Sequence, residues 1–148
     1  MIDLKQIHAM WKEDCNIDNA RLDETSKHTP TLHSKYLQYW STAKLELKRS
    51  EFEQKQLLKD KWLYYNGKMD QETLSKKGWN PDPFDGLKIL KGEMDYYYDS
   101  DPEIQKSEEK IQYWKTTIDT LMEIIDNLKW RHQTISNIIK WKQFESGN

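Results

Sequence analysis

Lysines alternate with large aromatic rings along residues 44–62, in a stretch that lacks glycine and proline from Thr31 to Tyr65. The members of this set are four, four, three, four and three residues apart: Lys44, Lys48, Phe52, Lys55, Lys59 and Trp62. Residues at these spacings share one face of a helix. Lysines neutralise phosphates, and aromatic rings provide surfaces on which unpaired bases stack. The pattern therefore predicts a helix face that binds single-stranded nucleic acid.

Three further residues near the end of this helix extend the candidate surface: Lys61, Tyr65 and Lys68. No base-reading motif occurs in the chain, so we expect the binding to tolerate any base sequence. A few phosphate contacts per subunit give weak affinity, which several copies in a closed oligomer would raise through effective concentration. A second interpretation stays open. Phe52 and Trp62 would also suit an apolar core, with the lysine side chains extending past them to water.

The residue types that usually carry catalysis show no catalytic spacing. The histidines His8, His28, His33 and His132 form no His-x-x-x-His pair, and Cys15 has no cysteine partner for a zinc site. The chain also lacks the glycine-rich phosphate loops of nucleotide-binding proteins. We therefore expect no enzyme activity, catalytic residue, metal or cofactor. The lone cysteine favours a cytoplasmic protein, and no apolar run approaches the roughly 20 residues needed to cross a bilayer.

The elements that must position the candidate surface predict an all-α protein. With 36% hydrophobic and 32% charged residues, the chain is too polar for a compact sphere and suits elongated helices or an oligomer. Thr29 and Pro30 supply a cap and a first-turn proline for one long helix, and Asp101 and Pro102 do the same for another. We expect a single helical domain over 1–148, comprising short helices over 3–29, a basic helix over 30–65, a connector over 66–101 and a heptad-patterned helix over 102–143.

Charge is segregated along the chain, although its net charge is only −2. Residues 30–65 carry seven basic and four acidic side chains, whereas residues 66–110 carry seven basic and eleven acidic ones. A basic helix therefore precedes an acidic connector. Because prolines and glycines interrupt the connector, we expect only short strands or docked loops there, at 87–90 and 96–98.

The last predicted helix carries an apolar stripe with alternating spacings of three and four residues, sustained over five heptads. Its apolar members from the second heptad onward are the candidate assembly residues: Ile111, Trp114, Ile118, Leu121, Ile125, Leu128, Ile135 and Ile139. Ile124, Ile138 and Trp141 widen the stripe, so it needs more than one neighbouring helix. Either the chain folds back as an antiparallel bundle, or both long helices face neighbouring subunits in a closed ring. A helical scaffold that binds only protein is therefore the alternative function.

Several short segments, in matching order and spacing, resemble the UvsY-type recombination mediators of T-even-type phages. The densest match is Leu58-Lys59-Asp60-Lys61-Trp62-Leu63-Tyr64-Tyr65-Asn66-Gly67-Lys68, where the family shows two basic residues and then Tyr-Tyr-x-Gly-basic. Weaker matches precede and follow it: Asn16-Ile17-Asp18, Leu32-His33-Ser34-Lys35-Tyr36-Leu37, Gln112-Tyr113-Trp114 and Phe144-Glu145-Ser146-Gly147. Residues 70–106 depart most from the family pattern.

The resemblance implies an all-helical protein that forms a homo-oligomeric ring, a hexamer or heptamer, and binds single-stranded DNA. It also implies that the protein loads a phage RecA-like recombinase onto DNA covered by the phage single-strand-binding protein, in the cytoplasm of an infected bacterial host cell. By position, the family's DNA-contacting basic pair falls on Lys59 and Lys61. The family's assembly helix corresponds to the stripe from Ile111 to Ile139.

Overall fold

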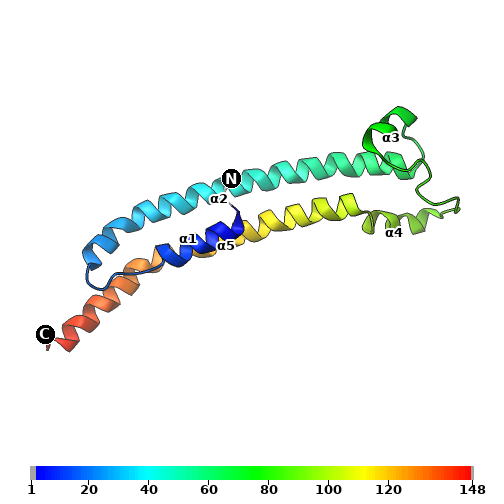
Figure 1. The fold of residues 1–148 in the computed structure, drawn as a ribbon. Helices are drawn as coiled ribbons and strands as arrows, with labels where there is room; N and C mark the ends of the chain where they lie inside the picture. The colour runs from blue at the N-terminus through cyan, green and yellow to red at the C-terminus, as the bar shows by residue number, and fades with distance from the viewer. Residues whose placement is uncertain (1–2, 148) are drawn as a thin grey trace. The chain divides into compact units, whose positions relative to one another are not determined.

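The computed structural model describes residues 3–147, which form helices joined by turns and loops and contain no strand. The predicted all-α class is therefore confirmed. The elements follow in the order α1 (Leu4–Asp14), α2 (Leu22–Tyr65), α3 (Gln71–Lys77), the 3-10 turn η1 (Lys91–Glu93), α4 (Met94–Asp99) and α5 (Pro102–Glu145) (Figure 1).

The described residues form two compact units. The first unit contains residues 3–45 and 114–147, and the second contains residues 46–113. The two long helices α2 and α5 each contribute to both units. The interpretation of residues 1–148 as one domain stays a prediction.

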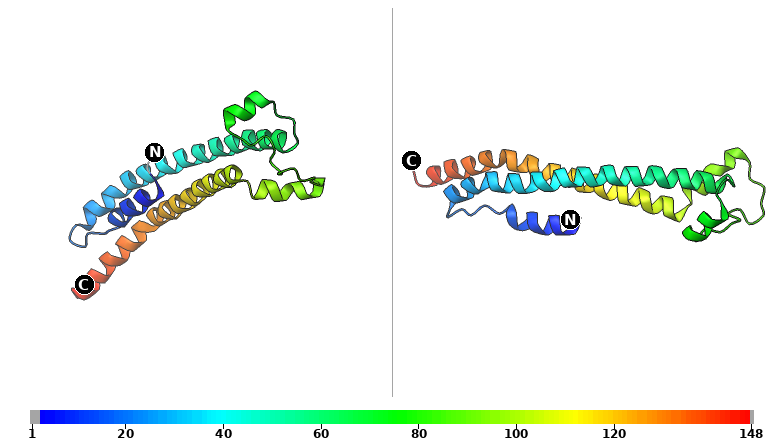
Figure 2. Two further views of the ribbon diagram at one scale, coloured as in Figure 1. Left: turned by 45° about the vertical axis from the view of Figure 1, so that its right-hand side comes forward. Right: turned by 90° about the horizontal axis from the view of Figure 1, so that it is seen from above.

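The first unit packs α1, the beginning of α2 and the later part of α5 around one apolar core. Within this unit α2 and α5 run antiparallel, and α1 lies alongside them (Figure 2). The core residues come from all three segments: Ile7, Leu32, Tyr36, Ala43, Leu121, Ile124, Ile125 and Leu128. Asp3 caps α1, because its carboxylate accepts from the N–H of Gln6 at 2.8 Å and the Gln6 side chain accepts from the N–H of Asp3 at 3.0 Å.

Polar contacts hold the C-terminal end of α1 against its two neighbours. The Arg131 guanidinium of α5 donates to the carbonyl oxygens of Asp14 and Asn16, each at 3.0 Å. From α2, the Lys35 ammonium and the Tyr36 hydroxyl reach one carboxylate oxygen of Asp14, at 2.6 and 2.8 Å. A cation at the C-terminal end of a helix and a carboxylate between two donors both favour this docked position.

α2 begins at Leu22, so the prediction that this helix starts at Pro30 is wrong. The residues just before Pro30, expected to form a separate short helix, form the first turns of α2. Thr29, expected as the cap, is helical, and its hydroxyl donates to the carbonyl of Thr25 at 3.4 Å. Pro30 lacks the N–H that would bond the carbonyl of Ser26. Pro30 and Ser26 are both exposed, and the helix continues through this position.

The second unit begins with the rest of α2, which ends at Tyr65 as predicted. Gly67 then turns the chain with a φ of +68°, a conformation that favours glycine. The connector is more helical than expected, because it contains α3 and α4. Asp70 begins α3 by accepting from the N–H of Thr73 at 3.2 Å. Residues 96–98, expected as a short strand or loop, belong to α4.

The apolar stripe of α5 is largely buried inside the chain. Leu121, Ile125 and Leu128 are at most 3% exposed in the core of the first unit, and Ile111 is 6% exposed in the second. Ile139, in contrast, is 43% exposed. Of the two arrangements that the stripe allowed, the chain takes the antiparallel one, so most stripe residues have their partners within the chain. Assembly of subunits through this stripe stays a prediction.

Candidate nucleic-acid interface

Five residues of α2 in the second unit form an exposed strip, which we call the basic–aromatic strip: Lys48, Phe52, Lys55, Lys59 and Trp62. Because α2 is a continuous helix here, the spacing predicted from the sequence does bring these residues to one face. Phe52 is 54% exposed and Trp62 is 47% exposed. The interpretation of these two rings as core residues is therefore wrong.

Lysine ammonium groups lie over both rings of the strip. The Nζ atoms of Lys48 and Lys55 lie 5.1 and 5.8 Å from the centre of the Phe52 ring. The Nζ of Lys68, which follows the turn at Gly67, lies 4.6 Å from the centre of the Trp62 ring. These cation–π contacts keep positive charge close to the ring faces. A nucleotide approaching the strip therefore meets a stacking surface and a cation together.

The lysines of the strip have few carboxylate partners. Lys48 forms an ion pair of 3.8 Å with Glu51 at the edge of the strip, and the side chains of that pair are 60% and 35% exposed. Lys55 and Lys59 are exposed and form no ion pair with any residue of the part of the chain that the structure describes. Exposed pairs are weak and unpaired ammonium groups need no rearrangement, so all three lysines are available to phosphates.

Other carboxylates of α2 are occupied by cations elsewhere in the second unit. Glu53 pairs with Lys110 of α5 at 3.0 Å. Asp60 pairs with Lys77 of α3 at 3.3 Å. These pairs neutralise acidic charge near the strip.

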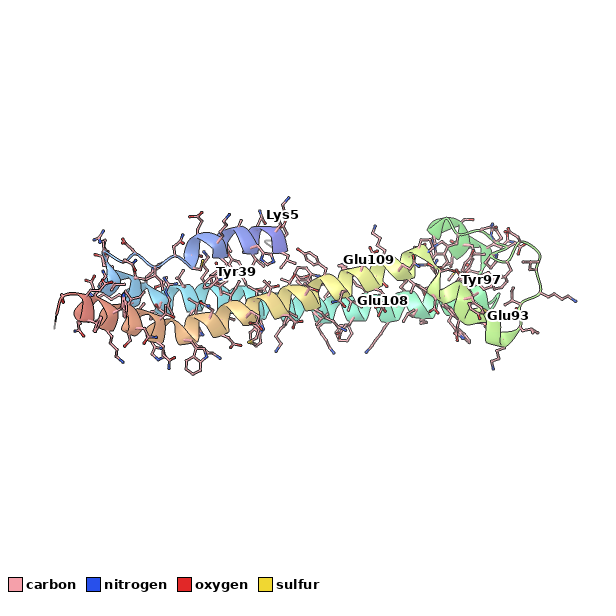
Figure 3. All side chains as sticks on the ribbon, turned by 90° about the horizontal axis from the view of Figure 1, so that it is seen from below. Lys5, Tyr39, Glu93, Tyr97, Glu108 and Glu109 are labelled. Atoms are coloured by element: carbon pink, nitrogen blue, oxygen red, sulfur yellow. The ribbon has the colours of Figure 1, made fainter. Side chains whose placement is uncertain are left out.

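An acidic groove of about 730 Å³ lies beside the same helix in the second unit. Its lining includes three apolar side chains and three carboxylates: Leu58, Tyr98, Asp99, Ile104, Gln105, Glu108 and Glu109. Glu108 and Glu109 project from α5 (Figure 3), and Glu108 accepts a hydrogen bond from Gln54 at 2.6 Å. Carboxylates repel phosphates. The groove therefore forms one edge of the surface that a nucleic-acid strand would follow.

Lys44, the first residue of the predicted set, lies in the first unit. It is exposed, and its Nζ lies 4.4 Å from the centre of the Trp40 ring, a further pairing of a cation with a ring. Among the nine predicted residues, Lys44, Lys68 and the five on the strip are therefore open to solvent.

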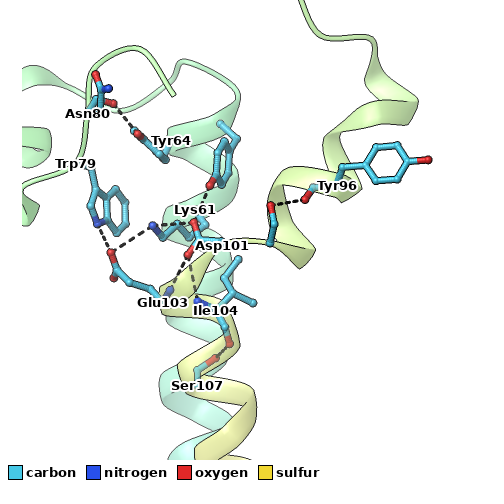
Figure 4. Close-up of polar contacts among 11 residues, drawn as sticks. Lys61, Tyr64, Trp79, Asn80, Tyr96, Asp101, Glu103, Ile104 and Ser107 are labelled. Carbon is cyan, nitrogen blue, oxygen red and sulfur yellow. Dashed lines mark hydrogen bonds and ion pairs between the residues drawn. The ribbon is translucent and has the colours of Figure 1, made fainter. Parts of the chain in front are cut away.

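Lys61, in contrast, is only 4% exposed. Its Nζ lies 3.0 Å from a carboxylate oxygen of Asp101 and 3.4 Å from one of Glu103 (Figure 4). The same ammonium lies 3.9 Å from the centre of the Trp79 ring, whose indole N–H donates to Glu103 at 2.5 Å. We call these four residues, with Tyr65, the Lys61 cluster.

Tyr65 contributes to this cluster through its hydroxyl and its ring. The hydroxyl donates to Asp101 at 2.7 Å. The ring contacts Phe84, Tyr97 and Tyr98, with centre-to-centre distances between 5.3 and 6.2 Å. Burial, followed by the hydrogen bond to Asp101 and that residue's negative charge, raises the pKa of Tyr65. The phenol is therefore a protonated donor that holds the end of α2 to the connector.

Asp101 joins the cluster to the start of α5. Its other carboxylate oxygen accepts from the backbone N–H groups of Glu103 and Ile104, at 2.9 and 3.2 Å, so it caps the helix as predicted. Burial alone would raise the pKa of Asp101, but the hydrogen bonds from Tyr65, Lys61 and Ile104 outweigh it and lower that pKa. A 3% exposed carboxylate therefore stays charged and needs the charge of Lys61 beside it.

Sequence reasoning identified Asp101 as a helix cap but did not connect it to Lys61, and it missed Trp79 and Glu103. The spacing of residues along α2 contains no information on which distant residue covers one side of that helix.

Metal binding has no evident site, because residues 3–147 hold no group of three or more His, Cys, Asp or Glu suited to an ion. Over the same residues, no helix has both the length and the apolar character to span a bilayer.

Comparison with known proteins identifies the chain's relatives. The family model described as "Recombination, repair and ssDNA binding protein UvsY" matches residues 10–148. The chain belongs to the UvsY family. This confirms the resemblance seen in the sequence.

The relatives of this UvsY-family chain match it over nearly its whole length. "Recombination protein uvsY" of Enterobacteria phage T4 is 28% identical over 144 residues, which cover 97% of this chain and 98% of the relative. A crystal structure of the bacteriophage T4 recombination mediator protein UvsY has a TM-score of 0.79 at 27% identity and covers 99% of both chains. A second crystal form has a TM-score of 0.78 at 26% identity and covers 97% of this chain and 99% of that one.

Proposed function

We propose that this UvsY-family chain binds single-stranded DNA along the basic–aromatic strip and Lys68 of the second unit, and that Lys44 of the first unit also contacts DNA. The observation that carries the proposal is the exposure of the Phe52 and Trp62 rings between ammonium groups that have few carboxylate partners. A duplex hides the faces of its bases, whereas a single strand offers both faces and phosphates. The strip therefore selects the single strand and tolerates its base sequence.

The proposal includes a role as a recombination mediator, the name that the T4 relative carries. The chain wraps or bends single-stranded DNA, weakens the hold of the phage single-strand-binding protein and presents the strand to a RecA-like recombinase. It acts in the cytoplasm of the infected bacterium by binding alone, without catalysing a reaction. The wrapped strand is favoured only if the chain binds it more tightly than the straight strand.

Assembly into a ring strengthens this binding in the proposal. Several large apolar side chains near the C-terminal end of α5 remain exposed: Trp130, Ile139, Trp141 and Phe144. Trp141 and Phe144 are 61% and 72% exposed and stack on each other at 5.4 Å. Exposed apolar side chains grouped in this way favour contact between subunits. A ring of subunits would combine several weak strips on one strand through effective concentration.

Titration with labelled oligonucleotides tests the proposed function. Fluorescence anisotropy would compare oligo-dT, a mixed-sequence single strand and a duplex of equal length, at 50 and 200 mM salt. We expect the two single strands to bind alike, the duplex to bind less tightly, and both single strands to lose affinity at the higher salt. If no single strand binds at either salt concentration, the protein-only scaffold becomes the better interpretation.

The aromatic part of the strip has its own test. The double variant F52A/W62A removes both exposed rings and keeps every lysine, and stacking on a ring contributes about 1–3 kcal/mol per base. We therefore expect oligo-dT to bind at least about fivefold more weakly, with the same salt dependence. The matched control is L90A/Y96A, which removes two exposed apolar side chains of the second unit outside the strip. Equal losses in the variant and the control would contradict the assignment.

A further inference from the structure

Lys59 and Lys61 stand two positions apart, yet they face opposite sides of α2. At 100° per residue they lie about 200° apart around the helix. Lys59 is exposed on the basic–aromatic strip, whereas Lys61 points into the second unit. A phosphate that reached Lys61 would have to displace Asp101, Glu103 and the Trp79 ring from its ammonium group.

The geometry points to different roles for the two lysines: Lys59 contacts phosphate, and Lys61 is a positioning residue that compensates the buried charge of Asp101. This inference rests on the proposed function and concerns how the same site is held in place. Lys61 acts on DNA binding only through the residues of its cluster, without touching the strand.

Asp101 depends on Lys61 for compensation of its charge. The Asp101 carboxylate accepts from Tyr65 and from two backbone N–H groups of α5, but Lys61 is the only cation paired with it among residues 3–147. Removing one partner of a buried ion pair leaves an uncompensated charge, which is far more disruptive than removing both. Loss of Lys61 would therefore force Asp101 toward solvent and break its bonds to α2 and α5.

The Lys61 cluster also supports the end of the strip. Tyr65 and Lys61 lie in the last turn and a half of α2, on either side of Trp62 in the sequence. The turn at Gly67 that follows carries Lys68, which covers the Trp62 ring. A displaced Asp101 releases the Tyr65 hydroxyl, so the last turn of α2 and the Trp62–Lys68 pair lose their fixed position.

The test separates contact from positioning by removing one charge or both. The variants are K61M, D101N, K61M/D101N and, for comparison, K59M, each checked for helicity and thermal unfolding. Oligo-dT affinity is then measured at several salt concentrations. The slope of affinity against salt counts phosphate contacts, at about 0.7 per contact for a single strand, and a positional change alters it only through the lysines that it displaces.

For K59M we expect a weaker affinity and a slope lower by about 0.7. For K61M we expect either failure to fold or an affinity loss of more than about fivefold, with the slope lower by no more than the about 0.7 that the displaced Lys68 contributes. The double variant K61M/D101N should fold and return to within about threefold of wild-type affinity with the wild-type slope, because no buried charge is then unpaired.

The decisive variant is K61M/D101N. If it folds but loses affinity and slope as K59M does, Lys61 contacts phosphate and the inference is overturned, while the proposed binding on the strip stands. If it does not fold, or folds and binds oligo-dT no more tightly than K61M, the coupling between Lys61 and Asp101 is overturned. If K59M and the wild type behave alike and neither binds oligo-dT, the proposed function itself fails.

Discussion

Neutralising the three lysines of the basic–aromatic strip should flatten the salt dependence of single-stranded DNA binding by a calculable amount. The variant is K48Q/K55Q/K59Q, in which each glutamine keeps polarity and much of the length of the lysine side chain. Each phosphate contact contributes about 0.7 to the slope of log affinity against log salt, so three contacts contribute about 2.1. Between 50 and 200 mM salt, a fourfold change, wild-type affinity should therefore fall about 18-fold more than that of the variant.

The structure sets the limits of this estimate. Lys55 and Lys59 have no carboxylate partner to leave among residues 3–147, so each should give a full contact. Lys48 must leave Glu51, but that pair is 3.8 Å long and largely exposed, so the cost is small. Because all three side chains are exposed, the free energy of unfolding should change by no more than about 0.5 kcal/mol per substitution.

The assay is fluorescence anisotropy of labelled oligo-dT at four or more salt concentrations. The matched control is K88Q/K91Q/K106Q, which removes three exposed lysines of the second unit that lie off the strip. We expect the control to keep the wild-type slope. Equal flattening in the variant and the control would show that only net charge matters, and the strip would then have no special role.

Three further predictions concern the first unit. Burial would raise the pKa of Asp14, but the hydrogen bonds from Lys35 and Tyr36 outweigh it and lower that pKa below its ordinary value of about 3.9. The stability from a lowered carboxylate pKa is complete above the ordinary value and disappears as pH falls through the lowered one. The difference in Tm between wild type and D14N should therefore be largest near neutral pH and narrow as pH falls below about 4; a difference that does not change between neutral and acidic pH would contradict this. The Leu128→Ala variant removes a 2% exposed side chain from the core and should lower the free energy of unfolding by about 2–5 kcal/mol in urea titrations, whereas a change under 1 kcal/mol would mean that the core is not packed as described. The W141S/F144S variant should have a lower molar mass than wild type by light scattering, with unchanged helicity, and an unchanged mass would remove these rings from the proposed assembly surface.

The sequence by itself determined the two long helices, apart from where α2 begins, and the strip. Helix periods, caps and stops are local properties of the chain. The cap at Asp3, the start at Pro102 and the stop at Gly67 all follow from residues within one turn of the boundary. The basic–aromatic strip is also local, because every member lies on one helix, and its period alone brings the side chains to one face.

Local signals were misleading where a helix tolerated an unfavourable residue or where remote contacts decided the structure. Pro30 favoured a helix start, but the helix bond is lost where Ser26 and Pro30 are both exposed, and α2 continues through it. The heptad stripe of α5 predicted a partner helix but did not indicate whether that helix belongs to the same chain or to another subunit. Only the folded chain shows that its own α1 and α2 cover residues such as Leu121 and Leu128.

Lys59 and Lys61 show most clearly what tertiary structure decided. They are the same residue type, two positions apart, and the sequence pattern treats both as candidates for phosphate. Their environments differ because Asp101 approaches α2 from a point 40 residues further along the chain and Trp79 from 18 residues further. Periodicity determines which side of a helix a residue faces, but the charge and burial on that side come from segments that only the fold brings there.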